Sequence, residues 1–156
     1  MSLLSNLLPL SNVELNIAVG DKRAALERAA HVFEESYGIG ASRILESLLA
    51  REQLGSTGLG KGVAIPHGRL RGLKRAAAAI LRLQRPIEFE SPDGRPVQLL
   101  VVLMVPEQAT EQHLEILSEL AQMLSDPSVR EQMLTIAQPA ELLQMVAAWE
   151  PIRPAA

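Results

Sequence analysis

Residues 55–68 read Gly-Ser-Thr-Gly-Leu-Gly-Lys-Gly-Val-Ala-Ile-Pro-His-Gly, and this stretch decides the interpretation of the chain. Four of its glycines fall within residues 55–62, and glycine lets backbone N–H groups point into a shared concavity. Pro66 and Gly68 prevent a helix or a regular central strand from continuing through His67. We therefore expect His67 at the end of an element, with its ring available beside anion-binding amides. That setting suits a nucleophilic imidazole that handles a phosphoryl group.

The same stretch nearly matches the nucleotide-binding pattern G-x-x-x-x-G-K-[ST], but its last place is wrong. Gly55, Gly60 and Lys61 fit that pattern, whereas Gly62 stands where a hydroxyl must bind Mg²⁺. The order of the elements is also inverted, because a helical segment precedes the glycines and an apolar, strand-like segment follows them. Nucleotide binding by this loop is therefore excluded.

Composition limits the possible partners. The 156 residues suffice for one domain, 1–156, with a sizeable core. A net charge of −3 and a pI near 5.6 argue against binding to nucleic acid, and the absence of cysteine excludes disulfides and thiolate chemistry. The longest apolar run, residues 99–105, is too short to span a membrane. We expect a cytoplasmic protein that inserts into no membrane and has a flexible tail at residues 150–156.

The pattern of apolar residues predicts the order of the elements. The two strongest strands are residues 76–83 and 97–105, and the second suits a strand covered on both faces. The other predicted elements are strands at 13–19 and 63–65, a short strand at 87–89, turns at 84–86 and 91–94, and helices at 21–37, 42–54, 110–124, from 127 onward and 139–149. The helix at 110–124 is expected to bury Leu114, Leu117, Leu120, Ala121 and Leu124. This order predicts an α/β fold, a single domain whose mixed β-sheet is sandwiched between helices on both faces.

The chain has three histidines, and their sequence settings do not support a functional role equally. His31 is expected on the solvent face of its helix. His113 lies in the first turn of the helix at 110–124, where the helix terminus lowers the pKa of its ring, and by itself it is typical of a half-buried structural histidine. His67, in its Pro-His-Gly setting, is the functional candidate.

Cations surround the glycine-rich stretch. Arg51 immediately precedes it, and its planar guanidinium can donate to phosphate oxygens, although a late-helix arginine commonly just complements the helix dipole. Lys61 and Arg69 flank the loop as less specific cations. Two histidines without a third ligand make a weak zinc site, and the chain has no G-x-S-x-G elbow for a Ser-His-Asp triad. We expect no metal and no cofactor.

The stretch resembles the active-site signature of the IIA proteins of the bacterial phosphoenolpyruvate-dependent phosphotransferase system, in the fructose/mannitol branch. The lead-in, residues 53–58, is most similar to that of nitrogen-regulatory IIA proteins. The resemblance extends over nearly the whole chain. It implies that His67 carries the phosphoryl group, that Arg51, sixteen residues earlier, supports it, and that His113, forty-six residues later, supports it as well.

The resemblance also implies a mechanism and partners. A phosphorylated HPr-like phosphocarrier is the expected donor, Nε2 of His67 the acceptor, and the chain a phosphotransferase that needs no metal. Amides of the phosphate-binding loop would hold the phosphoryl oxygens, and Ile65 and Leu70 would form the docking surface. The loop residues are Ser56, Thr57, Gly58, Gly60 and Gly68.

Three functions remain open at this point. A nitrogen-regulatory member binds targets such as potassium-transport proteins or sensor kinases according to its phosphorylation state, and we favour this function. A sugar-specific member of the fructose/mannitol type passes the phosphoryl group to a IIB partner. The third alternative is a binding module that keeps the fold without being phosphorylated.

Overall fold

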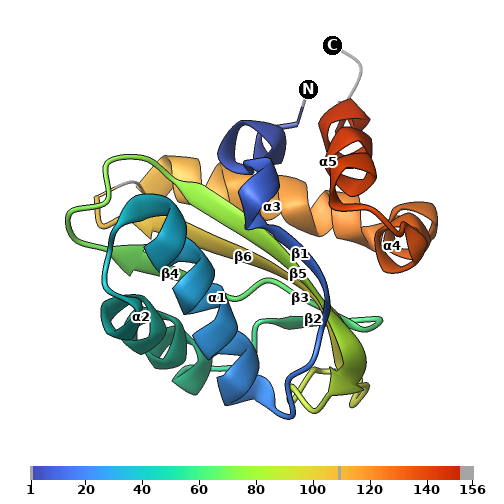
Figure 1. The fold of residues 1–156 in the computed structure, drawn as a ribbon, viewed down its shortest axis with the longest axis horizontal. Helices are drawn as coiled ribbons and strands as arrows, with labels where there is room; N and C mark the ends of the chain where they lie inside the picture. The colour runs from blue at the N-terminus through green and yellow to red at the C-terminus, as the bar shows by residue number, and fades with distance from the viewer. Residues whose placement is uncertain (1, 109, 152–156) are drawn as a thin grey trace.

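Two long antiparallel strands, β5 (Ala77–Ile87) and β6 (Val97–Pro106), form the centre of the fold in this computed structural model (Figure 1). The structure describes residues 2–108 and 110–151, with only the backbone of Thr110. Successive side chains of a strand point to opposite faces, so β5 and β6 supply two separate cores. Ile80 and Val101 belong to one core, whereas Leu81 and Val102 belong to the other.

Shorter strands extend this centre into a mixed sheet. The order of the described strands is β1–β5–β6–β3–β2, and β4 also pairs with β6. Strand β1 runs parallel to β5, β3 and β4 run parallel to β6, and β2 is antiparallel to β3. Their bounds are Val13–Ile17 for β1, Gly58–Gly60 for β2, Val63–Ala64 for β3 and His67–Leu70 for β4.

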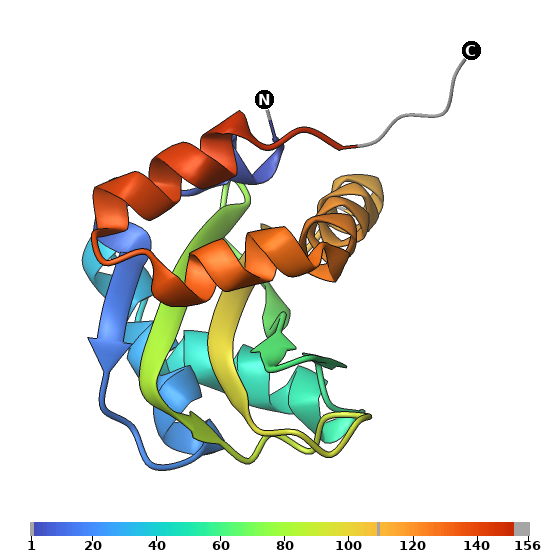
Figure 2. The same cartoon turned by 90° about the vertical axis from the view of Figure 1, so that its right-hand side faces the viewer.

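Helices cover both faces of the sheet, as predicted (Figures 1 and 2). Helices α1 (Lys22–Tyr37) and α2 (Ala41–Gln53) pack on the face that Leu81 and Val102 share. The opposite face is covered by α3 (Thr110–Ser125), α4 (Pro127–Thr135), α5 (Pro139–Ala148) and the 3₁₀ turn η1 (Leu4–Leu7), and a second turn, η2 (Leu10–Asn12), leads into β1. The predicted single-domain fold class is therefore confirmed.

Local capping signals place the helix ends where the sequence predicts them. The Asp21 side chain accepts a hydrogen bond from the Ala24 amide at the start of α1, and Gly38 ends that helix with a left-handed φ of 72°. Asp126 caps α4 in the same way, with Pro127 at the first helical position. Each described helix is either too short or too polar to serve as a transmembrane span.

Three local predictions are wrong. The predicted turn at 84–86 lies within β5, at an irregularity where the pairing jumps from Arg82–Leu99 to Ile87–Val97. Residues within such an irregularity form no hydrogen bonds with the neighbouring strand. Pro86, which has no N–H to donate, is therefore tolerated there. On α3, Leu114 is 67% exposed and Ala121 is also exposed. The buried side of α3 is His113, Ile116, Glu119, Leu120, Met123 and Leu124.

The pattern of apolar residues does not predict strands β2 and β4. Residues 152–156 of the predicted flexible tail lie outside the described part of the chain. Strand β4 begins at His67, which agrees with the expectation that this residue lies at the end of an element.

Candidate functional site

Three elements that are far apart in the chain bring His67, Arg51 and His113 together. His67 opens β4 and pairs with Leu103 of β6, whose amide donates to the Pro66 carbonyl at 2.9 Å. Arg51 lies in the last turn of α2, and His113 lies in the first turn of α3. Backbone pairing with the central strand therefore fixes the position of His67, while a helix from each face supplies one supporting side chain.

The hydrogen bonds of His67 define its tautomer. Its Nδ1 lies 2.9 Å from the Ile65 carbonyl, which can only accept, so Nδ1 carries the ring proton. Its Nε2 lies 3.2 Å from Nε of Arg51, which can only donate, so Nε2 presents a lone pair. The nucleophilic nitrogen of the neutral ring is thus Nε2, and it faces the guanidinium.

His113 lies edge-on to His67. The centroids of the two rings are 5.2 Å apart, and their planes are inclined by 72°. His113 is only 7% exposed, and neither of its ring nitrogens has a hydrogen-bond partner among the described residues. A buried imidazole without a partner costs free energy, so this ring is poised to bond a group that enters the site.

Burial keeps both rings neutral. It is the largest cause that lowers the pKa of His67, and the charges of Arg51 and Arg69 lower it further. The bond to the Ile65 carbonyl and the carboxylate of Glu52 act in the opposite direction but are outweighed. The pKa of His113 is also lowered, first by burial, then by repulsion from the His67 ring whenever that ring is protonated, and then by the charge of Arg69. The sequence predicted this direction for His113 but attributed it to the helix terminus.

The site is a shallow cavity of about 410 Å³ between α2, β4 and α3. Sequence reasoning missed three of its lining residues, which are Ser47, Ala50 and Leu54. A signal for them exists, because with Arg51 they repeat at the spacing of one helical face. Leu54 is 85% exposed, whereas the predicted docking residues Ile65 and Leu70 are 4% and 5% exposed. The predicted docking surface is therefore wrong, since those two side chains belong to the core.

Gly68 permits the close approach of β4 to α2. A Cβ atom at this position would overlap Oγ of Ser47, because the two atoms would lie closer than real contacts allow. The Ser47 hydroxyl meanwhile donates to the Arg69 carbonyl at 2.9 Å. This contact sets the separation of the helix that carries Arg51 from the strand that carries His67.

The residues of the glycine-rich loop mainly pair with one another or form hydrogen bonds with adjacent segments of the chain. Strands β2 and β3 form a hairpin whose turn, Lys61-Gly62, has φ values of 60° and 82°, as tight hairpin turns require. The Lys61 amide donates to Asp93 at 2.8 Å, and Gly60 packs against the same side chain. Among the residues described here, Lys61 lies away from the lining of the histidine pocket.

The start of the loop is tied to α2 by a carboxylate. The amide and hydroxyl of Thr57 both donate to Glu52, and the Gly58 amide donates to Oγ of Ser56. Glu52 also pairs with Lys22 at 2.7 Å. Of the predicted loop residues, Gly68 lines the histidine pocket, and the described lining does not include Ser56, Thr57, Gly58 or Gly60.

The guanidinium of Arg51 links the glycine-rich loop to His67 by donating a hydrogen bond to each. Its Nη1 donates to the Gly55 carbonyl at 2.8 Å, while its Nε donates to His67. The loop thus orients the arginine, and the arginine orients its donors toward Nε2. Within the described part of the chain, no cluster of three or more histidine or carboxylate side chains is placed to hold a metal ion.

Known proteins share this arrangement of sequence and fold. A nitrogen regulatory protein of Pseudomonas aeruginosa is 45% identical over 133 residues, which cover 85% of this chain and 86% of that protein. The crystal structure of nitrogen regulatory protein IIA-Ntr from Neisseria meningitidis is 45% identical and superposes with a TM-score of 0.89, covering 93% of this chain and 99% of that one. Mannitol IIA of Escherichia coli shares the fold at 19% identity, with a TM-score of 0.75 over 88% of this chain and 97% of that one.

The family model described as "Phosphoenolpyruvate-dependent sugar phosphotransferase system, EIIA 2" matches residues 6–149, nearly the whole chain. That match takes in His67, Arg51 and His113. The chain therefore belongs to the EIIA 2 family of the phosphoenolpyruvate-dependent sugar phosphotransferase system.

Proposed function

We propose that this chain is a phosphohistidine carrier that accepts a phosphoryl group on Nε2 of His67. The observation that carries the proposal is the orientation of the ring: Nδ1–H is held by the Ile65 carbonyl at 2.9 Å, and the Nε2 lone pair faces a cationic pocket. The lowered pKa of His67 keeps that lone pair available at neutral pH.

The phosphoryl transfer requires neither a metal ion nor an external base. Nε2 attacks the phosphorus of a phosphohistidine on an HPr-like phosphocarrier, so one N–P bond forms as the donor's N–P bond breaks. Because Nε2 carries no proton, none has to leave it, and Nδ1–H stays on the Ile65 carbonyl. Such a loose transition state needs mainly positioning and stabilisation of charge.

Arg51 supplies the charge. Its Nε occupies the lone pair of His67 at 3.2 Å, so the guanidinium must move aside as the phosphoryl group arrives. The same planar donors then face the phosphoryl oxygens, and Arg69 adds a second positive charge at the rim. His113, buried without a partner beside His67, donates a hydrogen bond to the product phosphate.

The donor docks around the exposed side chain of Leu54, which lies at the rim of this pocket. The phosphorylated and free forms then differ in charge at one surface, and this difference regulates nitrogen- or potassium-related targets, such as potassium-transport proteins or sensor kinases. The 45% identity to proteins named nitrogen regulatory protein supports this branch over transfer to a sugar-specific IIB partner.

Intact-mass measurement tests the proposal. The chain is incubated with phosphoenolpyruvate, Enzyme I and an HPr-like phosphocarrier, and we expect a gain of about 80 Da, the mass of one phosphoryl group. His67→Ala should abolish the gain, and His113→Ala should slow it. A folded chain that gains no mass is a binding module, and loss of labelling in His113→Ala alone reverses the assignment. Transfer onward to a purified IIB domain favours the sugar branch.

A further inference from the structure

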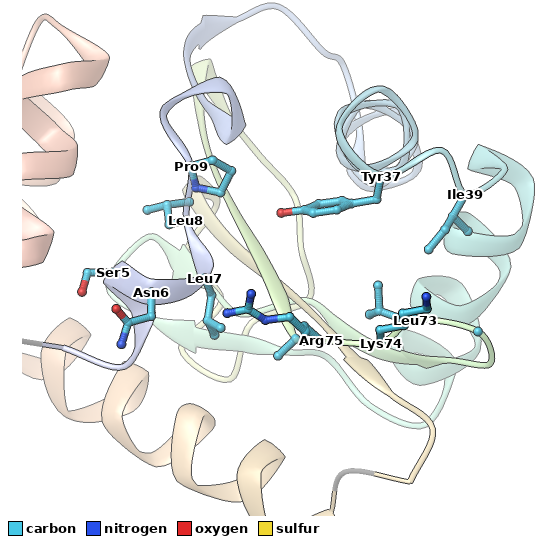
Figure 3. Close-up of a pocket in the computed structure, with 12 residues that line it drawn as sticks. Ser5, Asn6, Leu7, Leu8, Pro9, Tyr37, Ile39, Leu73, Lys74 and Arg75 are labelled. Carbon is cyan, nitrogen blue, oxygen red and sulfur yellow. The ribbon is translucent and has the colours of Figure 1, made fainter.

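A second cavity, of about 560 Å³, lies away from the histidine pocket (Figure 3). It is enclosed by the N-terminal segment, the end of α1 and the loop that joins β4 to β5. In the described structure it shares no lining residue with the pocket of His67. Its volume falls in the range of sites for small organic ligands.

The walls of this cavity are largely apolar. Leu8 and Ala76 are buried behind it, and Leu7, Ile39 and Leu73 are partly buried around it. Such a lining favours the apolar body of a ligand, because removing apolar surface from water is favourable.

The charge at the cavity is entirely positive. Lys74 and Arg75 belong to the lining, both are exposed, and neither side chain has a hydrogen bond or ion pair with a described residue. No carboxylate is among the described lining residues, although the chain as a whole carries a net charge of −3. Two unpaired cations beside an apolar cavity favour an anionic ligand.

Tyr37 adds an oriented donor. The buried Asn12 accepts a hydrogen bond from Ser36 on Oδ1, which turns its Nδ2 toward the Tyr37 hydroxyl at 3.2 Å. Since the hydroxyl oxygen accepts this bond, its proton remains available to a ligand. In Figure 3 the Tyr37 ring and the Arg75 guanidinium lie one above the other, and both extend toward the N-terminal segment that carries Leu7 and Leu8.

We propose that this cavity binds a small organic anion with an apolar body, a carboxylate or sulfonate whose charge meets Arg75, Lys74 and the Tyr37 hydroxyl. The ligand site is separate from the phosphorylation site and does not depend on the function proposed for His67. Apolar walls supply the affinity, and the three donors select negative charge.

The test uses two fluorescent probes with the same rings. Anilinonaphthalene sulfonate carries the negative charge, and phenylnaphthylamine is its uncharged counterpart. Titration of the whole chain, followed by fluorescence and by amide chemical shifts, should show one saturable site for the sulfonate. The shifts should centre on Leu7, Ile39 and Leu73, and the uncharged probe should bind at least tenfold more weakly.

Variants separate the anion site from general charge. Lys74→Gln with Arg75→Gln should weaken sulfonate binding about tenfold and leave the uncharged probe unaffected, and Tyr37→Phe should weaken it several-fold. Arg85→Gln with Arg95→Gln makes the same change in net charge outside the cavity, and should have no effect. The proposal is overturned by the absence of saturable binding, by shifts centred on the His67 pocket, or by equal losses in the two double variants.

Discussion

At the scale of single residues, the chemistry depends on which nitrogen of His67 holds the proton. A carbonyl on one side and a guanidinium on the other leave one tautomer with both bonds satisfied. Burial then keeps the ring neutral, and the charge of Arg51 acts in the same direction. The charge of Arg51 that lowers the pKa of His67 is thus the same charge that the proposed mechanism uses to stabilise the phosphoryl group.

Arg51→Gln tests the charge at this site. Removal of the guanidinium should slow phosphoryl transfer to His67 about a hundredfold, the usual cost of losing a preorganised charged donor. Arg51→Lys should recover only part of the rate, because an ammonium lacks the planar pair of donors. Single-turnover transfer of labelled phosphate measures the rates. Arg23→Gln, an exposed change on α1, is the matched control, and an equal rate in Arg51→Gln and Arg23→Gln contradicts the assignment.

The lowered pKa values predict how stability varies with pH. Near and below the ordinary histidine pKa of 6.5, the unfolded chain binds protons on these rings more readily than the folded chain does. The free energy of unfolding should therefore be highest above this pH. It should decrease as the pH falls toward the lowered pKa values of the two rings in the folded state. Urea denaturation between pH 5 and about 8 measures this dependence.

Substitution isolates the contribution of the two rings. The double variant His67→Asn with His113→Asn should flatten the decrease on acidification. His31→Asn, which changes an exposed histidine on α1, should retain it. If all three chains lose stability in parallel, groups other than the buried pair cause the dependence.

At the scale of elements, the site depends on how closely α2 approaches β4. Gly68 lies against Ser47 at the point of contact, and the two elements carry His67 and Arg51. Strand β4 in turn is held by its pairing with β6. A small change in the spacing of α2 and β4 therefore alters the geometry of the site.

Gly68→Ala should destabilise the fold by about 1–3 kcal/mol, because the new methyl group overlaps Oγ of Ser47. It should also slow transfer, since α2 and Arg51 move away from His67. Addition of Ser47→Ala should restore part of both losses. In a double-mutant cycle we expect a coupling of more than about 0.5 kcal/mol. Strictly additive effects of the two changes contradict this contact.

Local signals predicted some elements and not others. The cap at Asp21 and the apolar run of β6 could be read from neighbouring residues. Strand β4, which is four residues long and contains a glycine, exists because its backbone pairs with β6, a partner distant in sequence. The same reason explains β2, whose glycines Gly58 and Gly60 pair with residues of β3.

The residues of the site also divide into those that the sequence predicts and those that it does not. The sequence singled out His67, Arg51 and His113, and the structure brings them to one pocket. Ser47 and Leu54 were missed, although helical spacing from Arg51 indicates their face. Ile65 and Leu70 were assigned to a docking surface because apolar residues beside a turn can be exposed or buried, and only the packing of the sheet decides.

At the scale of the whole molecule, the sheet separates two cores and leaves the histidine pocket where helices of both layers meet. Helix α2 belongs to one layer and α3 to the other, and His67 lies on the strand between them. A donor protein that reaches His67 must therefore contact both layers. The exposed side chain of Leu54 lines the same pocket.

Leu54→Asp tests this docking. We expect the KM for the HPr-like donor to rise about tenfold, equivalent to about 1.4 kcal/mol of lost association energy, with little change in kcat. Because the side chain is 85% exposed, the free energy of unfolding should change by less than about 0.5 kcal/mol. Leu10→Asp, at a second exposed leucine that lines neither described pocket, is the control. Equal KM values in the two variants contradict a docking role for Leu54.

Nitrogen-resolved NMR of the phosphorylated chain shows which ring nitrogen forms the phosphoramidate. With ¹⁵N-labelled histidine, we expect phosphorus coupled to Nε2 of His67, while Nδ1 keeps its proton. Phosphorus on Nδ1 of His67, or on either nitrogen of His113, would contradict this expectation.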